Sequence, residues 1–450
     1  MKKQNEISTK YVDVLDGIRV ISVIIVLIFH FWQQTWIFPV IKTPFLSFIG
    51  ITQINFTPFA KVGYLFVDMM ILISGFLLFL PVARNILSGE PLSSWKSYFK
   101  KRAVRILPSY LFCVIAIFVY ELAMGGYGKP VDAGAALQDL LLHLFFMHTW
   151  TVRTYLMTKL NVVLWTLAVE VWFYVLFPAF ACFIKRWKNE KNARGSLIRS
   201  ALLAVLLVGA SHIYIHLYVL RSGSALSNAV DSAFAFVGSG IRSSYLAMVI
   251  NQLPAFFGTY AVGLLGALVY VAAASKMKRK VWTGILFNIV CIGAIWLMVR
   301  MVKECSDLDL SLAQEWQMTK RLRLALVFMA VILSAAFSSG WFRFLFSNRL
   351  MRFLSGISYN LYIWHQWLCV KLKNEWRIPP WEGDVPPNQW GNEVGRAWSA
   401  SYALIITLFA FGAAILATYL IERPAADLLN GRRSIYNGKL RELKNAKPKE

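Results

Sequence analysis

Two ionisable residues stand at the ends of an apolar stretch near the start of the chain, LDGIRVISVIIVLIFHFW at residues 15–32. Arg19 and His30 are separated by ten residues, and no other ionisable side chain follows Arg19 in this stretch. At about 1.5 Å per residue, eleven steps along a helix cover about 16 Å, roughly half of the ~30 Å hydrocarbon core of a bilayer. If Arg19 lies at one surface, we expect His30 near the midplane, where an imidazole can exchange protons.

Three further ionisable residues stand deep in other apolar segments. Asp68 lies in GYLFVDMMILISGF, Glu170 in LWTLAVEVWFYVLFP and His365 in ISYNLYIWHQ. Charged groups at this depth cost several kcal/mol, so they should face a wet cavity or a partner. With His30 they predict a polar cavity near the midplane. A structural role stays open for each of them, as a hydrogen-bond partner between helices, and it explains Glu170 least well because tryptophans lie on both sides of it.

The segment around His365 also shows a helical pattern. Tyr359, Tyr362 and His365 recur every three residues, so a helix places them along one face. Two phenols and an imidazole in a row can bind hydroxyl groups or move protons. An aromatic belt is the alternative, but belts lie at the membrane interface and this row continues into the core. We interpret the row as cavity lining.

A basic cluster precedes the third apolar segment, in YFKKRAVRILP. Arg102 and Arg105 share a helix face at a spacing of three, with Lys101 beside them. Arginine is suited to forked contacts with phosphate, so the cluster could bind a cytoplasmic phosphate-bearing donor. An ordinary positively charged membrane anchor is the alternative. The sequence has no phosphate-binding glycine loop, HExxH motif or catalytic-serine elbow, and nothing in it indicates a metal.

The composition places these motifs in a membrane protein. The chain has 450 residues, of which 58% are hydrophobic and only 16% charged. We expect ten transmembrane helices, at about 20–38, 62–80, 106–124, 161–184, 200–220, 252–274, 282–299, 324–339, 353–370 and 399–421. The first of these should be a retained helix, since it is too long for a signal peptide and no small-residue cleavage site follows it.

The basic residues predict the orientation. With the N-terminus inside, the cytoplasmic segments hold 31 of the 47 Lys and Arg residues, in agreement with the positive-inside rule. Both termini are then cytoplasmic. The net charge of +24 reflects this topology and contact with anionic membrane lipid, not binding to nucleic acid. The predicted fold is all-α and polytopic, with a membrane domain at 1–425 and a basic cytoplasmic tail at 426–450.

Five stretches together resemble the integral-membrane acyltransferase family three, which includes bacterial O-antigen and peptidoglycan O-acetyltransferases. They are the opening stretch with its Arg–ten residues–His spacing, VGYLFVDMMILISGFLL, YFKKRAVRILP, LWTLAVEVWFYVLFP and SGISYNLYIWHQ, in the family's order over about residues 15–370. One departure is the Met-Met pair of VDMMILISG, where the family has an aromatic pair.

The resemblance implies transfer of an acyl group, commonly acetyl from acetyl-CoA, to a hydroxyl of a glycan or another surface molecule in the plasma membrane. The site residues that we expect on these grounds are His30, Glu170, His365 and Tyr362 as catalytic groups; Arg19, Lys101, Arg102 and Arg105 as binding groups for acyl-CoA; and Asp68, Ser74, Trp165 and Tyr359 as cavity lining. A proton-coupled transporter or flippase is the alternative, because midplane Asp, Glu and His also form proton relays. The sequence does not indicate the acceptor, the acyl chain length or the oligomeric state.

Overall fold

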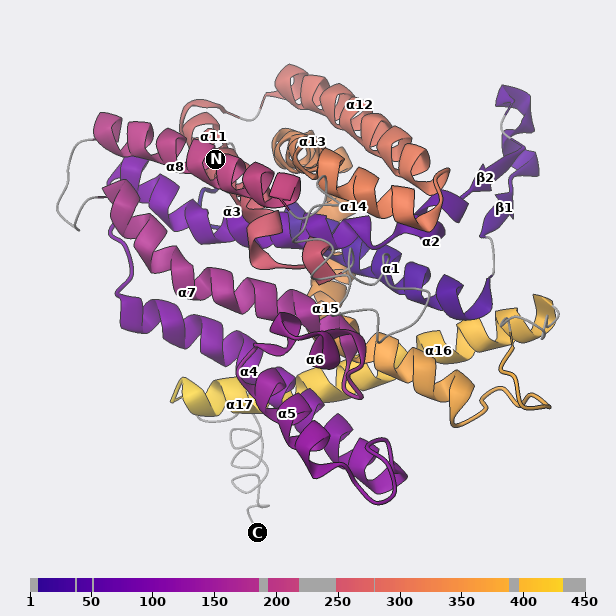
Figure 1. Ribbon diagram of the computed structural model, residues 1–450. Coiled ribbons are helices and arrows are strands. Elements are labelled where there is room, and N and C mark those ends of the chain that lie inside the picture. The colour runs from indigo at the N-terminus through magenta and orange to yellow at the C-terminus, as the bar shows by residue number, and fades with distance from the viewer. Residues whose placement is uncertain are drawn as a thin grey trace, which may run out of the picture.

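Helices make up most of the chain that the structure describes (Figure 1). The structure is a computed structural model and describes residues 7–36, 39–50, 52–185, 193–217, 248–278, 280–387 and 396–431. The first half contains α1 (Val14–Thr35), β1 (Val40–Lys42), η1 (Pro44–Ile49), β2 (Gln53–Asn55), α2 (Thr57–Val62), α3 (Leu65–Ser88), α4 (Trp95–Met124), α5 (Ala133–Leu144), η2 (His148–Trp150), α6 (Val152–Leu156), η3 (Val162–Leu164), α7 (Trp165–Lys185) and α8 (Ala193–Ile215). The second half contains η6 (Leu253–Phe256), α11 (Phe257–Lys276), α12 (Val281–Ser306), α13 (Leu310–Phe337), α14 (Gly340–Ser347), α15 (Arg349–Asn374), α16 (Arg396–Ala417), the π-helical turn η7 (Thr418–Glu422) and α17 (Arg423–Leu429).

Within the described residues, eight helices are long and apolar enough to cross a membrane. A ninth candidate is the pair Leu312–Phe337 and Gly340–Asn374, which is bent by 119°. Each of the ten predicted spans overlaps a helix, but the count of ten is not confirmed because 324–339 and 353–370 both fall in this bent pair. The chain is an all-α, multi-pass membrane protein.

The bend between α13 and α14 exposes backbone groups that α12 satisfies. The Ser339 backbone N–H donates to Asn288 Oδ1 at 3.0 Å, and Asn288 Nδ2 donates to Ser339 Oγ at 2.8 Å. Since unsatisfied backbone groups are costly in a bilayer, this side-chain pairing lets the chain turn without a continuous helix. The turn directs α15 back into the bundle, where it packs against α1.

The centre of the bundle depends on close contact between α3 and α11. An added Cβ at Gly75 would lie 2.8 Å from the Tyr260 ring, and one at Gly263 would lie 2.8 Å from the Phe76 backbone nitrogen. Small residues at such crossings let two helix backbones approach, which is how helices associate in lipid. The SGF sequence of the second apolar segment therefore packs helices together and holds Ser74 at a fixed position.

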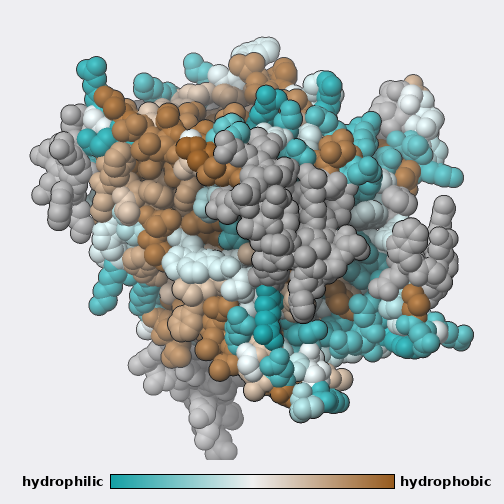
Figure 2. Space-filling model, in the orientation of Figure 1, coloured by the Kyte–Doolittle hydropathy of each residue, from teal (hydrophilic) through white to brown (hydrophobic). Residues whose placement is uncertain are grey.

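The surface agrees with a membrane location. On the face shown in Figure 2, hydrophobic side chains cover the middle of the helices and hydrophilic ones gather towards their ends. On α12 the exposed residues Ile285, Ile289, Ile292 and Trp296 recur at helical spacing, so one apolar stripe faces outwards. A stripe of this kind suits contact with lipid chains.

Several shorter elements lie outside the spans. β1 and β2 form a two-stranded antiparallel hairpin after α1. After α4, residues 137–147 form a short apolar stretch that overlaps α5. At 12 residues, α5 is too short to cross a bilayer. Residues 1–6, and 432–450 of the predicted tail 426–450, lie outside the described residues, so the cytoplasmic location of the termini stays a prediction.

Candidate active site

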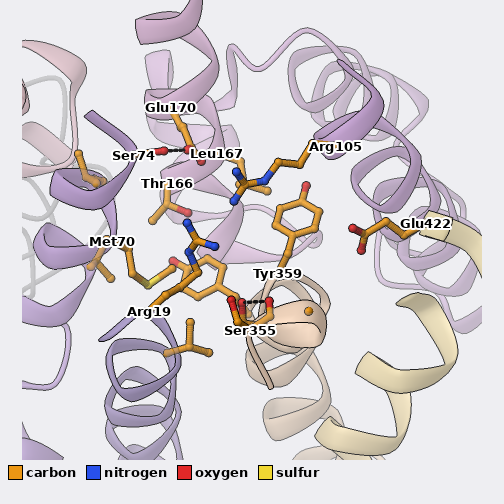
Figure 3. Close-up of a pocket in the computed structure, with 16 residues that line it drawn as sticks. Arg19, Met70, Ser74, Arg105, Thr166, Leu167, Glu170, Ser355, Tyr359 and Glu422 are labelled. Atoms are coloured by element: carbon orange, nitrogen blue, oxygen red, sulfur yellow. Dashed lines mark hydrogen bonds between the residues drawn. The ribbon is translucent and has the colours of Figure 1, made fainter. Parts of the chain in front are cut away.

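A polar cavity of about 310 Å³ lies among the helices and brings together six of the predicted site residues (Figure 3). α1, α3, α4, α7, α15 and η7 each contribute to its walls. The lining residues are Arg19, Val23, Val67, Met70, Ile71, Ser74, Arg105, Thr166, Leu167, Glu170, Ser355, Gly356, Ser358, Tyr359, Tyr362 and Glu422. Met70, the second residue of the Met-Met pair that replaces the family's aromatic pair, is among them, so this departure changes the cavity wall.

Two arginines from different helices point into this cavity. Arg19 on α1 and Arg105 on α4 face the same space in Figure 3 and lie close enough to interact electrostatically. Within the described residues, neither makes an ion pair or a hydrogen bond through its guanidinium group. Arg105 is also exposed, so the cavity is open beside it. Two unpaired guanidinium groups at an open mouth favour an anionic ligand.

Two carboxylates line the cavity, and neutral side chains hold both of them. Glu170 accepts hydrogen bonds from the hydroxyls of Ser74 and Tyr174, which also contact each other at 3.1 Å. Glu422 accepts one from Asn360 Nδ2 at 2.6 Å. Donors of this kind fix a carboxylate in place without neutralising its charge. The carboxylates therefore stay available to balance the charges of the two arginines.

Sequence reasoning missed Tyr174 and Glu422. Tyr174 lies four residues after Glu170, a spacing that places two side chains together on a helix. This signal was available in the sequence. Glu422 directly follows the last apolar segment, at 399–421, and the π-helical turn of η7 is what brings it to the cavity. Such turns are frequent at functional sites, but the sequence gives no sign of this one.

The two membrane histidines, His30 and His365, form a hydrogen-bonded pair. His365 Nε2 lies 3.1 Å from His30 Nδ1, and the rings meet edge to face with centroids 4.9 Å apart. His365 Nδ1 lies 2.7 Å and 3.2 Å from the carbonyl oxygens of Tyr362 and Leu361. The sequence predicts both histidines at a shared polar cavity, and the structure places them in contact with each other, on α1 and α15.

The hydrogen bonds assign the protons of the neutral pair. Carbonyl oxygens only accept, so His365 carries its proton on Nδ1 and its Nε2 is an acceptor. His30 must then donate from Nδ1, which also lies 3.0 Å from the Val26 carbonyl oxygen. The lone pair of His30 is consequently on Nε2. This nitrogen has the form that a general base requires.

Tyr362 lies between the cavity and the histidine pair. Its side chain lines the cavity, and its ring centroid is 5.7 Å from that of His365. The histidines themselves are not among the lining residues. The hydroxyls of Tyr362 and Tyr359 donate to the backbone carbonyl oxygens of Val163 and Ile106, at 3.4 Å and 3.1 Å. The tyrosine–histidine row on α15 thus runs from the cavity to the pair.

α4 begins at Trp95, so the basic cluster is part of a helix. Its residues line two different cavities. Arg105 enters the cavity, whereas Lys101 and Arg102 line a separate pocket of about 120 Å³ between α3, α4 and α7. The Arg102 guanidinium carbon lies 5.3 Å from the ring centroid of Tyr174, whose hydroxyl reaches Glu170. Tyr174 therefore contacts one residue of each: Glu170 of the cavity and Arg102 of the separate pocket.

Asp68 and Trp165 lie elsewhere. Asp68 is buried in an ion pair with Arg321, with Asp68 Oδ2 and Arg321 Nε 3.1 Å apart, and Trp165 stacks on Phe256 with centroids 6.0 Å apart. Neither residue is among those that line the cavity, in contrast to the expectation from the sequence. Within the described residues, no group of three or more His, Cys, Asp and Glu side chains could hold a metal ion.

Comparison with known proteins identifies the class of enzyme. A family model described as an acyltransferase domain matches residues 12–423. The peptidoglycan O-acetyltransferase OatA of Listeria monocytogenes is 24% identical over 223 residues, which is 46% of this chain and 30% of the relative. The O-acetyltransferase OatA of Staphylococcus aureus is 24% identical over 216 residues, with the same two shares. The matches thus span about a third of the length of these relatives, and no solved structure matches the chain.

The match covers all six elements of the cavity and both histidines. It confirms the resemblance that the five stretches carry, and it does not favour the transporter alternative. The chain belongs to this acyltransferase family.

Proposed function

We propose that the chain transfers an acyl group, most simply acetyl, from acyl-CoA to a hydroxyl of a cell-surface glycan. The observation that carries this proposal is the continuity from two unpaired arginines, through Tyr362, to a histidine with a free Nε2 lone pair. One end of this path suits an anionic donor, and the other suits proton removal from a hydroxyl. The names of the relatives, O-acetyltransferase and peptidoglycan O-acetyltransferase, support the same chemistry.

The donor would enter past Arg105. Its phosphates would contact the exposed Arg105, with Arg19 deeper in the cavity and Lys101 and Arg102 in the neighbouring pocket. At about 310 Å³ the cavity is near the lower end of the ~300–1,000 Å³ of typical ligand pockets, so it suits the narrow thioester arm of the donor. Glu170 and Glu422 would reduce the repulsion between the two arginine side chains.

His30 would act as the general base. Its Nε2 takes the proton of the acceptor hydroxyl while the oxygen attacks the thioester carbonyl carbon. The tetrahedral intermediate then collapses, the carbon–sulfur bond breaks, and the CoA thiolate takes the proton back from His30. A base of this kind contributes about 10²–10⁴-fold to a rate. His365 accepts the Nδ1–H of His30 throughout and keeps the lone pair on Nε2.

The thioester must pass the Tyr362 side chain to reach His30, since Tyr362 separates the cavity from the histidines. A ring that turns on its Cα–Cβ bond would open this path. The acceptor is taken here as a hydroxyl of peptidoglycan or a related glycan, because the Listeria relative is named for that substrate.

The test is acetyl-CoA turnover by the purified full chain in detergent, with release of the CoA thiol as the readout and a cell-envelope extract as acceptor. Arg105→Gln should raise the KM for acetyl-CoA roughly 10-fold or more, because a hydrogen bond to a charged group contributes about 1.5–3 kcal/mol. Arg300→Gln is the matched control, since Arg300 on α12 is exposed and lies over Trp296, away from the cavity. Equal KM values for both variants, or no CoA binding to the wild type by calorimetry, would refute the assignment of the donor site.

A further inference from the structure

A second cavity lies between α8, α11 and α13, and it shares no lining residue with the candidate active site. Its volume is about 220 Å³. In the bundle, α11 packs against both α8 and α13 (Figure 1). The lining combines polar groups, among them Arg321, Arg323, His212 and Thr259, with apolar walls such as Val208 and Leu322. The cavity therefore suits a ligand that has both a polar and an apolar part.

Arg321 supplies a buried guanidinium group that is only partly satisfied. The residue is 2% exposed. Its Nε donates to Asp68 at 3.1 Å, and its Nη1 donates to the Ile250 and Ala255 carbonyl oxygens at 3.0 Å and 3.4 Å. Its Nη2 is buried and has no partner among the described residues. A buried N–H group without a partner is costly, so this nitrogen calls for an oxygen acceptor in the cavity.

Thr259 repeats this pattern on the neighbouring helix. Its side chain is completely buried in the first turn of α11, and its hydroxyl has no partner in the described part of the chain. Ser211, by contrast, already donates to the Ala255 carbonyl oxygen at 3.2 Å. Two unsatisfied groups from two helices thus line one cavity, and one bound oxyanion can accept from both.

The charges around the cavity favour an anion. Asp68 neutralises Arg321 from α3, but Asp68 does not line the cavity. Arg323 and His212 are both exposed and do line it. None of the described lining residues is a carboxylate. A phosphate that enters would therefore meet two arginines and no acidic group in the wall.

We propose that this second cavity binds the phosphate group of an amphipathic molecule, with Arg321, Arg323 and Thr259 around the phosphate oxygens. The apolar walls and the position of the cavity between membrane helices favour a lipid phosphate over free phosphate. The site stands apart from the proposed acyl transfer. Two contacts of Arg321 lead towards the active site. Arg321 lies 4.1 Å from the ring centroid of Phe256, which stacks on Trp165, the residue before the cavity residue Thr166. Its ion-pair partner Asp68 follows the cavity residue Val67.

The experiment is native mass spectrometry of the purified full chain in detergent, with three probes. They are a short-chain phosphatidic acid, the diacylglycerol with the same chains, and inorganic phosphate. We expect phosphatidic acid to bind at least 10-fold more tightly than diacylglycerol. Displacement of phosphatidic acid by inorganic phosphate at similar concentration would support the phosphate site and identify free phosphate as the better ligand. Equal binding of phosphatidic acid and diacylglycerol would overturn the proposal.

Two variants locate the binding. Thr259→Val keeps the shape of the side chain and removes the unpaired hydroxyl, and Arg323→Gln removes an exposed charge. Each should weaken phosphatidic acid binding several-fold, while Arg300→Gln should not change it. Arg321→Gln leaves Asp68 unpaired and can fail to fold, so the double variant Asp68→Asn with Arg321→Gln replaces it. Unchanged binding in Thr259→Val, Arg323→Gln and the double variant would show that the phosphate lies elsewhere and overturn the proposal.

Discussion

The protein contains two pairs of histidines whose contacts differ. His30 and His365 meet edge to face, with one N···N contact of 3.1 Å. His143 and His148 stack in parallel, with centroids 4.0 Å apart and an angle of 5° between the rings. The first pair joins two long membrane helices beside a cavity, and the second joins α5 to η2 outside the spans.

The two pairs differ in their partners and in their burial. His143 Nδ1 lies 2.8 Å from the Asp139 carbonyl oxygen and 3.2 Å from its carboxylate, which also accepts from Tyr127 and Thr158. This network ties the loop together by several fixed contacts. His30 has only carbonyl and imidazole partners, both at Nδ1, so its Nε2 keeps a lone pair. His143 likewise has its partners at Nδ1, and its Nε2 is buried without a partner among the described residues. The comparison therefore teaches that a free ring nitrogen is not sufficient for chemistry: His30 is only half-buried, beside the cavity, whereas His143 and His148 are fully buried.

The largest effect should follow from removing the free nitrogen. His30→Ala should lower kcat by about 10²–10⁴-fold, the usual contribution of a general base, with little change in melting temperature. His148→Ala, the matched change in the stacked pair, should lower the melting temperature and leave kcat unchanged per folded molecule. Acetyl-CoA turnover and thermal unfolding of both purified variants check this contrast. Equal turnover by His30→Ala and wild type would show that His30 is not the general base.

A smaller effect should follow from removing the partner of His30. His365→Leu takes away one of the two acceptors of the Nδ1–H and leaves only the Val26 carbonyl oxygen. The proton is then held less firmly on Nδ1, and molecules that carry it on Nε2 lack the base. We expect a loss of roughly 10–100-fold in kcat, as for other groups that orient a functional histidine. His365→Gln can still accept through its amide oxygen and should recover much of the rate. If Leu and Gln give the same kcat, His365 does not act through the proton position of His30.

The smallest effect concerns stability and pH. Burial, together with the neighbouring His143, holds the pKa of His148 well below its usual value. The unfolded chain therefore binds this proton more readily below about pH 6.5, so the stability from neutral His148 is full above that pH and falls as the pH decreases. His148→Phe keeps a ring in the stack and should reduce this dependence. Melting temperatures between pH 5 and 8 provide the measurement, and a wild-type curve that is flat down to pH 5 would contradict it.

The site was only partly predictable. An ionisable residue in an apolar segment has few possible roles. For this reason the sequence could indicate residues that lie at the cavity or beside it: Arg19, His30, Glu170, Tyr359 and His365. Asp68 has the same sequence signal but is paired with Arg321, which the sequence placed in an external loop. A charged residue in an apolar segment indicates that a partner is needed, but the sequence does not indicate which residue supplies it.

The sequence by itself determined the helical membrane architecture, the family and the residues most costly to bury. Apolar runs long enough to cross a bilayer must form helices, since lipid offers the backbone no hydrogen bonds. Only the tertiary structure decided how the charges are shared: Arg19 and Arg105 face a cavity, while Arg321 meets Asp68. It also decided which nitrogen of His30 is free, because that depends on a ring 335 residues away along the chain.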